Sequence, residues 1–279
     1  MSYITFKTIG DAGDLGSQIQ QYASLYAIAK ASGKTIVFPE SSLTLGYGFK
    51  FANLLDIPIE IKSNDFFDHF IDIRPDDRQI VDSSLFQLQS NKNYNIVNRF
   101  DLYKYWHPTC AEDVLQWSWN RDHEQVAKRM MELIAQPGKE LVAIHVRRGD
   151  YLLPKHDHFC KLNTDYYSEA LQPYIDELEK YHFVIFSNDI EWCKESLIEG
   201  DMVTFVEPGL DCVDMIAMSM CDHFIIANSS YSWWAAFKSK SPNKKVTCPI
   251  NYLKSYSPWS HINGNYYPSE WNGIHNNSI

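Results

Sequence analysis

The sequence predicts an α/β protein of two domains, each built on a mostly parallel sheet covered by helices. After residue 140, short apolar segments alternate regularly with amphipathic helices, a pattern that produces parallel sheets. Residues 3 to 38 form a separate strand–helix–strand unit. The segment QPGKE, Gln136 to Glu140, puts Pro and Gly between two periodic segments, as a linker does. We therefore expect domains at residues 1–137 and 138–279.

The first domain opens with the strand YITFKTI, followed by a glycine-rich turn and a long helix. Ile19, Tyr22 and Ala29 fall on one face of this helix, and Ser32-Gly33 ends it. TIVFP is the next strand. Residues 41 to 125 are rich in aromatic residues, Asn and Asp, and offer only short strand-like pieces such as IPIEI and YNIVN, so their order is not predicted.

The second domain follows a helix in HEQVAKRMMELIA and repeats strand and helix to its end. Asn163 or Thr164 caps the first of its helices. The tail YLKSYSPWSHINGNYYPSEWNGI is aromatic and rich in turns, and we expect it to pack back on the first domain. The expected strands are 141–146, 182–187, 202–208, 223–227 and 244–249, and the helices are 163–181, 189–198, 212–221 and 229–240.

Charge and cysteine usage limit the function classes. The formal net charge is −10, which argues against a nucleic-acid partner, because such proteins carry a basic stripe. A phosphate-bearing ligand must therefore be held by a local cationic cluster. None of the six cysteines forms a C-x-x-C pair, which favours free thiols in a reducing compartment.

Targeting signals are also absent from the pattern. The segment MSYITFKTIG lacks the basic and apolar regions of a signal peptide, and no apolar run approaches the ~18 residues of a membrane span. Asn228-Ser229-Ser230 matches a glycosylation sequon, which has little weight without a secretory signal. We expect a cytoplasmic protein.

The motif HVRRGDY, His145 to Tyr151, closes the first strand of the second domain. Alternation along the strand puts His145 and Arg147 on the same face at its carboxyl end, where ligands of open α/β sheets bind. A planar guanidinium suits bidentate contact with phosphate oxygens. Arg148 faces the other way, toward Asp150 or another acid. The alternative is a structural ion pair at a strand end.

A second motif, GLDCVDMIAMSMCDHFIIANSSYSWW, contains the starts of two helices. Asp214 lies at the start of one, and Ser229-Ser230 begin the next after an apolar strand. A helix amino end with two hydroxyls is an anion site, because its N–H groups point outward. Asn228 or Ser229 can instead cap its own helix, and both functions are compatible. Trp233-Trp234 favour a place in the core.

The turn between the first strand and helix has glycines at 10, 13 and 16. This spacing is neither G-x-G-x-x-G nor a Walker loop, and its two aspartates would repel phosphate, so close approach to a neutral substrate fits better. Metal signals are weak. No Asp-x-Asp occurs, and His156-x-His158-x-Cys160 lacks a fourth ligand at zinc-finger spacing. No G-x-S-x-G elbow indicates a hydrolase.

HVRRGDY, FSNDIEWCKESL and ANSSYSWWAA, in this order, resemble the bacterial-type α-1,2-fucosyltransferases of glycosyltransferase family 11. The resemblance covers nearly the whole chain and is strongest from about residue 140 to 240. It implies a GT-B fold, with two Rossmann-like domains and a cleft between them. It further implies an inverting transfer of L-fucose from GDP-β-L-fucose to the 2-hydroxyl of a galactoside, in glycan or O-antigen biosynthesis.

The same resemblance implies roles for individual residues. Arg147 would hold the diphosphate beside His145 and Arg148, and Asp214 would read guanine. Asn228, Ser229 and Ser230 would contact phosphate or ribose, and Gly16, Ser17 and Gln18 would form the acceptor-side loop. Arg147, Asp150 and His145 are the catalytic candidates, with Asp150 either the base or an orienting partner of Arg148. No metal and no cofactor is implied.

The chain departs from the family at one loop. The family form G-L-G-N-Q-x-F-Q-Y-A reads GDLGSQIQQYA here, so Ser17 replaces the Asn that approaches the reacting sugar in related enzymes, and Gln20 replaces the Phe. Three alternatives remain open: another GDP-6-deoxyhexose, another acceptor position, or a nucleotide-sugar-binding module without catalysis. The partners implied are GDP-fucose and a galactose-terminated glycan, with peripheral membrane contact if that acceptor is lipid-linked.

Overall fold

The computed structural model describes residues 1–11, 13–98 and 102–276 of the chain. By packing, the chain divides into two compact units, Met1–Arg121 and Asp122–Ile279. The sequence placed the boundary at residue 137, whereas this division gives nearly all of helix α4 (Arg121–Ile134) to the second unit. The Pro–Gly turn expected to be a linker therefore joins α4 to strand β9 within that unit.

The first unit contains a four-stranded parallel sheet of order β2-β1-β7-β6. The predicted strand–helix–strand unit is confirmed: β1 and β2 pair in parallel with α1 between them. Gly33 ends α1 at φ 65°, a left-handed conformation that favours glycine, and its N–H donates to the carbonyl of Ala29. The bounds are β1 Tyr3–Thr5, α1 Leu15–Ser32, β2 Thr35–Ile36, β6 Ile71–Ile73 and β7 Tyr94–Ile96.

The expected strand TIVFP is two strands instead of one. Val37 separates β2 from β3, and β3 leaves the first sheet to pair with β5. The segment of uncertain order, residues 41 to 125, consists mostly of very short elements, including several turns of 3₁₀ helix. Besides β6, β7 and the start of α4, its helices and strands are α2 Lys50–Leu54, β4 Leu55–Asp56, β5 Ile61–Lys62, α3 His107–Gln116 and β8 Ser118–Trp119, and β3 Phe38–Pro39 directly precedes it.

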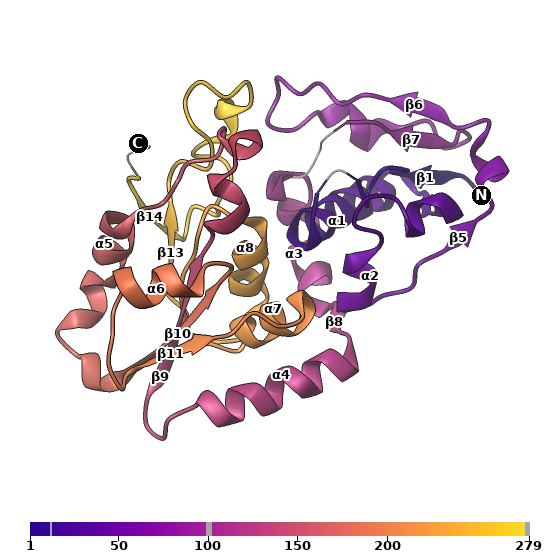
Figure 1. Cartoon of the computed structure of the whole chain (residues 1–279). Helices are drawn as coiled ribbons and strands as arrows, with labels where there is room; N and C mark the ends of the chain where they lie inside the picture. The colour runs from indigo at the N-terminus through magenta and orange to yellow at the C-terminus, as the bar shows by residue number, and fades with distance from the viewer. Residues whose placement is uncertain (12, 99–101, 277–279) are drawn as a thin grey trace. The chain divides into compact units, whose positions relative to one another are not determined.

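The second unit contains a six-stranded parallel sheet of order β11-β10-β9-β12-β13-β14. The alternation predicts its first five strands in chain order and their parallel pairing, whereas β14 was not predicted. Figure 1 shows α5 and α6 on one side of this sheet and α7 and α8 on the other. The bounds are β9 Glu140–Val146, α5 Thr164–Ile175, β10 Tyr181–Ser187, α6 Ile190–Ser196, β11 Val203–Val206, α7 Asp211–Ser219, β12 His223–Ile225, α8 Ser230–Lys238, β13 Val246–Pro249 and β14 Asn272–Ile274.

Alternate residues of the strands face opposite sides of the second sheet. Val142, Ile144 and Val146 of β9 pack in one buried cluster with α5, including Tyr166 and Tyr167. The predicted cap of α5 is confirmed, because the side chain of Asn163 accepts from the N–H of Tyr166. The described part of the tail adds β14 to this sheet, in parallel with β13. Its expected packing on the first unit stays a prediction.

Candidate functional site

Three adjacent strands of the second sheet end at one edge, and polar segments follow each of them. β9, β10 and β12 are parallel neighbours, so their carboxyl ends meet. Arg147 to Asp150 follow β9, Asn188 and Asp189 follow β10, and Asn228 to Ser230 follow β12 closely. The fold therefore brings together residues that lie far apart in the sequence.

Arg147 and Asp150 form the central ion pair of this edge. Arg147 Nη2 donates to Asp150 Oδ2 at 2.9 Å, and its Nε lies 2.9 Å from Oδ1. The guanidinium also lies over the ring of Tyr151, 5.6 Å from its centroid. The Arg147 side chain remains 27% exposed, so part of it is open to a ligand. The ion pair fixes a guanidinium at the carboxyl end of the sheet.

Arg148 turns to the opposite face of the sheet, as its parity predicts. Its Nε donates to Asp189 Oδ2 at 3.2 Å, and its guanidinium lies 4.1 Å from the ring centroid of Trp192 in α6. The acid beside Arg148 is therefore Asp189, and Asp150 contacts Arg147 instead. These contacts give Arg148 a structural role between β9 and α6.

His145 is buried beneath the edge, against the start of α8. Its Nδ1 lies 2.8 Å from the Oγ of Ser232, and its ring lies 5.5 Å from that of Tyr231. Burial, with a smaller contribution from the charge of Arg147, lowers the pKa of the imidazole from 6.5 to about 3. His145 is therefore neutral at physiological pH, with one nitrogen held by Ser232.

The start of α8 contains Asn228, Ser229 and Ser230, which have different surroundings. The buried Asn228 donates through Nδ2 to the carbonyls of Cys160 and Tyr252, at 2.8 and 3.0 Å. Ser229 is the N-cap, and its Oγ accepts from the N–H of Tyr231. Ser230 is partly exposed at the first helical position. The sequence-based capping function is confirmed for Ser229, and Asn228 ties the helix start to neighbouring loops.

Asp214 lies in the first turn of α7, and its Oδ2 accepts from the N–H of Gly209 at 3.0 Å. Burial is the main cause that raises the pKa of Asp214, opposed by the hydrogen bond from Gly209. The hydroxyl of Tyr231 donates to the carbonyl of Asp211 at 2.7 Å, which joins α7 to the start of α8. Asp214 and the α8 amino end thus belong to one connected structure.

Gly16, Ser17 and Gln18 lie in the first turn of α1, in the first unit. Gln18 is fully buried; its Nε2 donates to the carbonyl of Gly13, and its Oε1 accepts from the N–H of Phe51. Gln18 therefore supports the loop, while Ser17 is partly exposed. Ala12, part of the same glycine-rich turn, lies outside the described residues.

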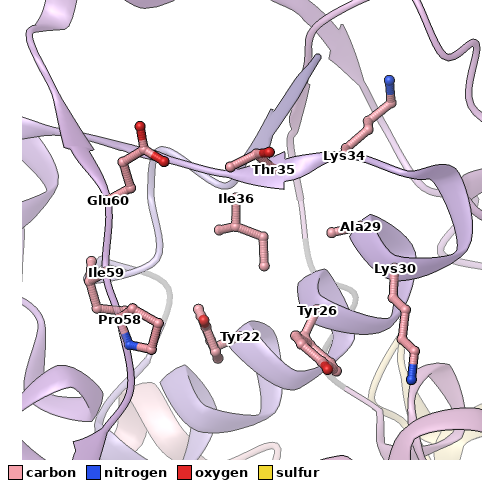
Figure 2. A pocket seen from close by; sticks show the side chains of 10 residues that line it. All are labelled: Tyr22, Tyr26, Ala29, Lys30, Lys34, Thr35, Ile36, Pro58, Ile59 and Glu60. Atoms are coloured by element: carbon pink, nitrogen blue, oxygen red, sulfur yellow. The ribbon is translucent and has the colours of Figure 1, made fainter. Parts of the chain in front are cut away.

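The first unit also has an open pocket of about 680 Å³ between α1, β2 and residues 58–60. Figure 2 shows an interior formed by Tyr22, Ile36 and Ile59, with the lysine side chains pointing away from it. Lys30 pairs with Asp113, and Lys34 donates to two backbone carbonyls and to Ser2. Because both ammonium groups are engaged elsewhere, this pocket does not have the chemistry of a diphosphate site.

Comparison with known proteins identifies the family. The model for glycosyl transferase family 11 matches residues 2–275. The chain belongs to this family. The predicted resemblance is therefore confirmed. The name of the family gives its general activity, the transfer of a glycosyl group.

Two relatives of this family 11 chain differ in how much of the chain they match. It is 38% identical over 104 residues to the alpha-1,2-colitosyltransferase of Escherichia coli, a stretch that covers 34% of the chain and 35% of that relative. It is 27% identical over 291 residues to galactoside alpha-(1,2)-fucosyltransferase 2 of Gorilla gorilla gorilla, covering 96% of the chain and 78% of the relative. The match over about a third of the chain thus has the higher sequence identity, and the match over nearly the whole chain has the lower.

A solved structure supports the fold of this family 11 member. The fucosyltransferase NodZ from Bradyrhizobium has a TM-score of 0.54 and 14% identity, covering 84% of this chain and 91% of that one. NodZ was also co-crystallized with GDP. At this identity the likeness shows the fold alone, and it confirms the predicted GT-B-type α/β class. The cleft between the domains stays a prediction.

The structure adds two residues to the candidate site that lie inside the quoted motifs but were not among the predicted site residues. Asn188 contacts both the backbone of Arg148 and the carboxylate of Asp150, and Ser232 contacts His145. A signal for Asn188 was present, since it is polar and directly follows a buried strand. Ser232 had no such signal, because only the packing of α8 on the sheet brings it to His145.

Among residues 1–11, 13–98 and 102–276, no three His, Cys, Asp or Glu side chains are grouped to hold a metal ion. The rings of His156 and His158 lie 6.1 Å apart, and His156 Nε2 lies 4.0 Å from Asp150. Within the same ranges, no helix is long and apolar enough to cross a membrane.

Proposed function

We propose that the chain is an inverting, metal-independent α-1,2-glycosyltransferase that moves L-fucose from GDP-β-L-fucose to the 2-hydroxyl of a galactoside. The observation that carries the proposal is the Arg147 guanidinium, fixed by Asp150 at the sheet edge where the amino end of α8 also lies. Similarity over 96% of the chain to a galactoside alpha-(1,2)-fucosyltransferase supports the donor sugar and the linkage.

The proposed reaction breaks one bond and forms another at the same carbon. The bond from the anomeric carbon to the GDP oxygen breaks, the acceptor oxygen bonds to the opposite face of that carbon, and the hydroxyl proton passes to a base. Negative charge grows on the departing diphosphate. Arg147 and the N–H groups of the α8 amino end are placed to stabilise this charge more in the transition state than in the ground state.

Asp150 is better suited to orient Arg147 than to act as the base. Both of its carboxylate oxygens already lie against the guanidinium, and Asn188 donates to Oδ1 at 3.1 Å. Accepting a proton from the acceptor would weaken both contacts at the moment when Arg147 must be fixed. Asp214, partly buried at the start of α7, fits the reading of guanine, because a carboxylate can accept from its N1 and N2 donors.

The experiment that tests this proposal is transfer from GDP-fucose to an array of β-galactosides. We expect product on acceptors with a free 2-hydroxyl on terminal galactose and none on their 2-deoxy analogues, with an α-anomeric coupling in the NMR spectrum of the product. Product on the 2-deoxy acceptor, or a β linkage, would contradict the linkage or the inverting mechanism.

A second candidate is transfer of colitose, which is L-fucose without its 3-hydroxyl. The observation that favours it is the 38% identity over 104 residues to an alpha-1,2-colitosyltransferase. Competition between GDP-fucose and GDP-colitose at equal concentration decides between the two donors. Preference for the fucosyl donor, measured as the ratio of kcat/KM values, supports the first proposal.

A further inference from the structure

Asn188 links two loops at the carboxyl edge of the second sheet. Ser187, the last residue of β10, pairs in register with Val146, the last residue of β9. Asn188 therefore emerges beside the loop that contains the two arginines. Its Oδ1 accepts from the N–H of Arg148 at 3.0 Å, and its Nδ2 donates to Asp150 Oδ1 at 3.1 Å.

Both bonds need a primary amide, which combines an acceptor and a donor at this reach. An aspartate at 188 would keep an acceptor for the N–H of Arg148 and would set a second carboxylate against Asp150. A side chain without polar atoms would leave both loop groups without this partner. Asparagine is therefore matched to the two groups that it contacts.

Gly149 leaves the space that the Asn188 amide occupies. A Cβ at position 149 would lie 2.6 Å from Asn188 Nδ2, closer than real Cβ contacts, and 3.1 Å from its Cγ, which is tight. Glycine is required at position 149 because any side chain there would displace the amide of Asn188. The sequence Arg-Gly-Asp after β9 and the Asn after β10 thus form one fitted pair of loops.

We propose that Asn188 is a positioning residue for glycosyl transfer: it holds Asp150, and Asp150 in turn fixes the Arg147 guanidinium toward the diphosphate. This rests on the proposed GDP-sugar site. The order of contacts is Asn188 to Asp150 to Arg147, so the amide acts on the ligand only through the ion pair. Small errors in placing such a group have large effects on rate.

The test compares GDP affinity and transfer kinetics of Asn188→Ala and Asn188→Asp with those of the wild-type chain. We expect both variants to lose about ten- to a hundredfold in kcat/KM and to bind GDP more weakly, because Arg147 is no longer held. Asn188→Asp keeps the bond to Arg148 and is expected to be no better than Asn188→Ala. Asn163→Ala, which removes the α5 cap, is the control for lost stability alone.

Double-variant cycles separate positioning from folding. In an Asp150→Ala background, Asn188→Ala should change GDP affinity less than about twofold, since the residue through which it acts is gone. Gly149→Ala should reproduce the loss of Asn188→Ala and add little to it in the double variant. Additive losses in both cycles would overturn the proposal.

The outcomes also distinguish this proposal from the function on which it rests. A wild-type chain that binds GDP and transfers fucose, with an equally active Asn188→Ala variant, would overturn the positioning role alone. A wild-type chain that does not bind GDP would overturn both. A loss of melting temperature in Asn188→Ala with unchanged GDP affinity would make Asn188 purely structural and would also overturn the role.

Discussion

At the scale of single residues, the two neighbouring arginines have different partners because β9 sends their side chains to opposite faces. Arg147 meets Asp150 at the open edge, and Arg148 meets Asp189 and the ring of Trp192 on the α6 side. Strand alternation predicts this division. The identity of each acid is not predictable from it, because Asp189 follows a strand that only the folded sheet places beside β9.

The Arg147 side chain should be essential for transfer. We expect Arg147→Ala to abolish measurable activity and Arg147→Lys to recover little, because an ammonium cannot make two parallel contacts. A single charge-assisted contact contributes ~1.5–3 kcal/mol, and more where charge develops in the transition state. The measurement is kcat/KM with GDP-fucose, beside the exposed Arg129→Ala as control. Wild-type kcat in a folded Arg147→Ala variant would contradict this role.

The buried His145 should make stability depend on pH. The unfolded chain takes up a proton at His145 below about pH 6.5, whereas the folded chain keeps it neutral down to about pH 3. The unfolded state binds more protons in this window, so stability falls as pH falls through it. We expect His145→Asn to flatten the curve by up to about 1.4 kcal/mol per pH unit, measured by urea unfolding from pH 4 to 7. Parallel curves for the two proteins would exclude a buried neutral histidine.

Asp214 should determine which nucleobase the nucleotide-binding site prefers. We expect Asp214→Asn to weaken GDP binding and to narrow the preference for GDP over ADP and UDP, because Asn cannot accept from both guanine donors. Asn can still accept from the N–H of Gly209, so the start of α7 should remain intact. Competition assays with the three nucleotides give the result. If the ratios of the affinities for GDP, ADP and UDP are the same in Asp214→Asn as in the wild-type chain, Asp214 does not recognise guanine.

At the scale of elements, long alternating segments were predictable and short ones were not. β9 and β10 each have seven residues, and β12 overlaps a run of four apolar residues, 224–227, so the apolar pattern of these strands can be recognised. In the first unit, β4 and β5 have two residues each, too few for alternation to show. What holds them is pairing with partners distant in sequence. This is why residues 41 to 125 could not be ordered.

The amino end of α8 combines a structural and a proposed ligand-binding function. Ser229→Ala should cost ~0.5–2 kcal/mol of unfolding free energy, because its Oγ caps the N–H of Tyr231. Ser230→Ala leaves this cap in place and is the matched comparison. If the helix end also meets phosphate, Ser229→Ala weakens GDP binding as well. Urea unfolding and calorimetric titration with GDP measure the two effects, and equal unfolding of both variants would contradict the capping role.

At the scale of the whole molecule, the charge balance opposes the proposed ligand. The chain carries a formal net charge of −10, and GDP is also an anion. Binding must therefore depend on local groups, of which Arg147 and the α8 amino end are the ones that the fold assembles. The acidic composition argued against a broad basic surface. The position of the motifs, directly after strands of the second domain, predicted where the local binding site lies. The acid beside each arginine, and the amide of Asn188, needed the assembled sheet.

The same reasoning predicts that transfer does not depend on a divalent metal. The sequence has no Asp-x-Asp, and Arg147 with the helix amino end supplies positive charge at the leaving group. If a metal performed this task, its removal should cost several kcal/mol, at least about a hundredfold in rate. The measurement is the initial rate at saturating GDP-fucose before and after exhaustive chelation, with circular dichroism to check the fold. We expect most activity to remain. A hundredfold loss that Mg²⁺ or Mn²⁺ restores would show that the leaving-group charge is stabilised by metal, and the arginine-based mechanism would then be wrong.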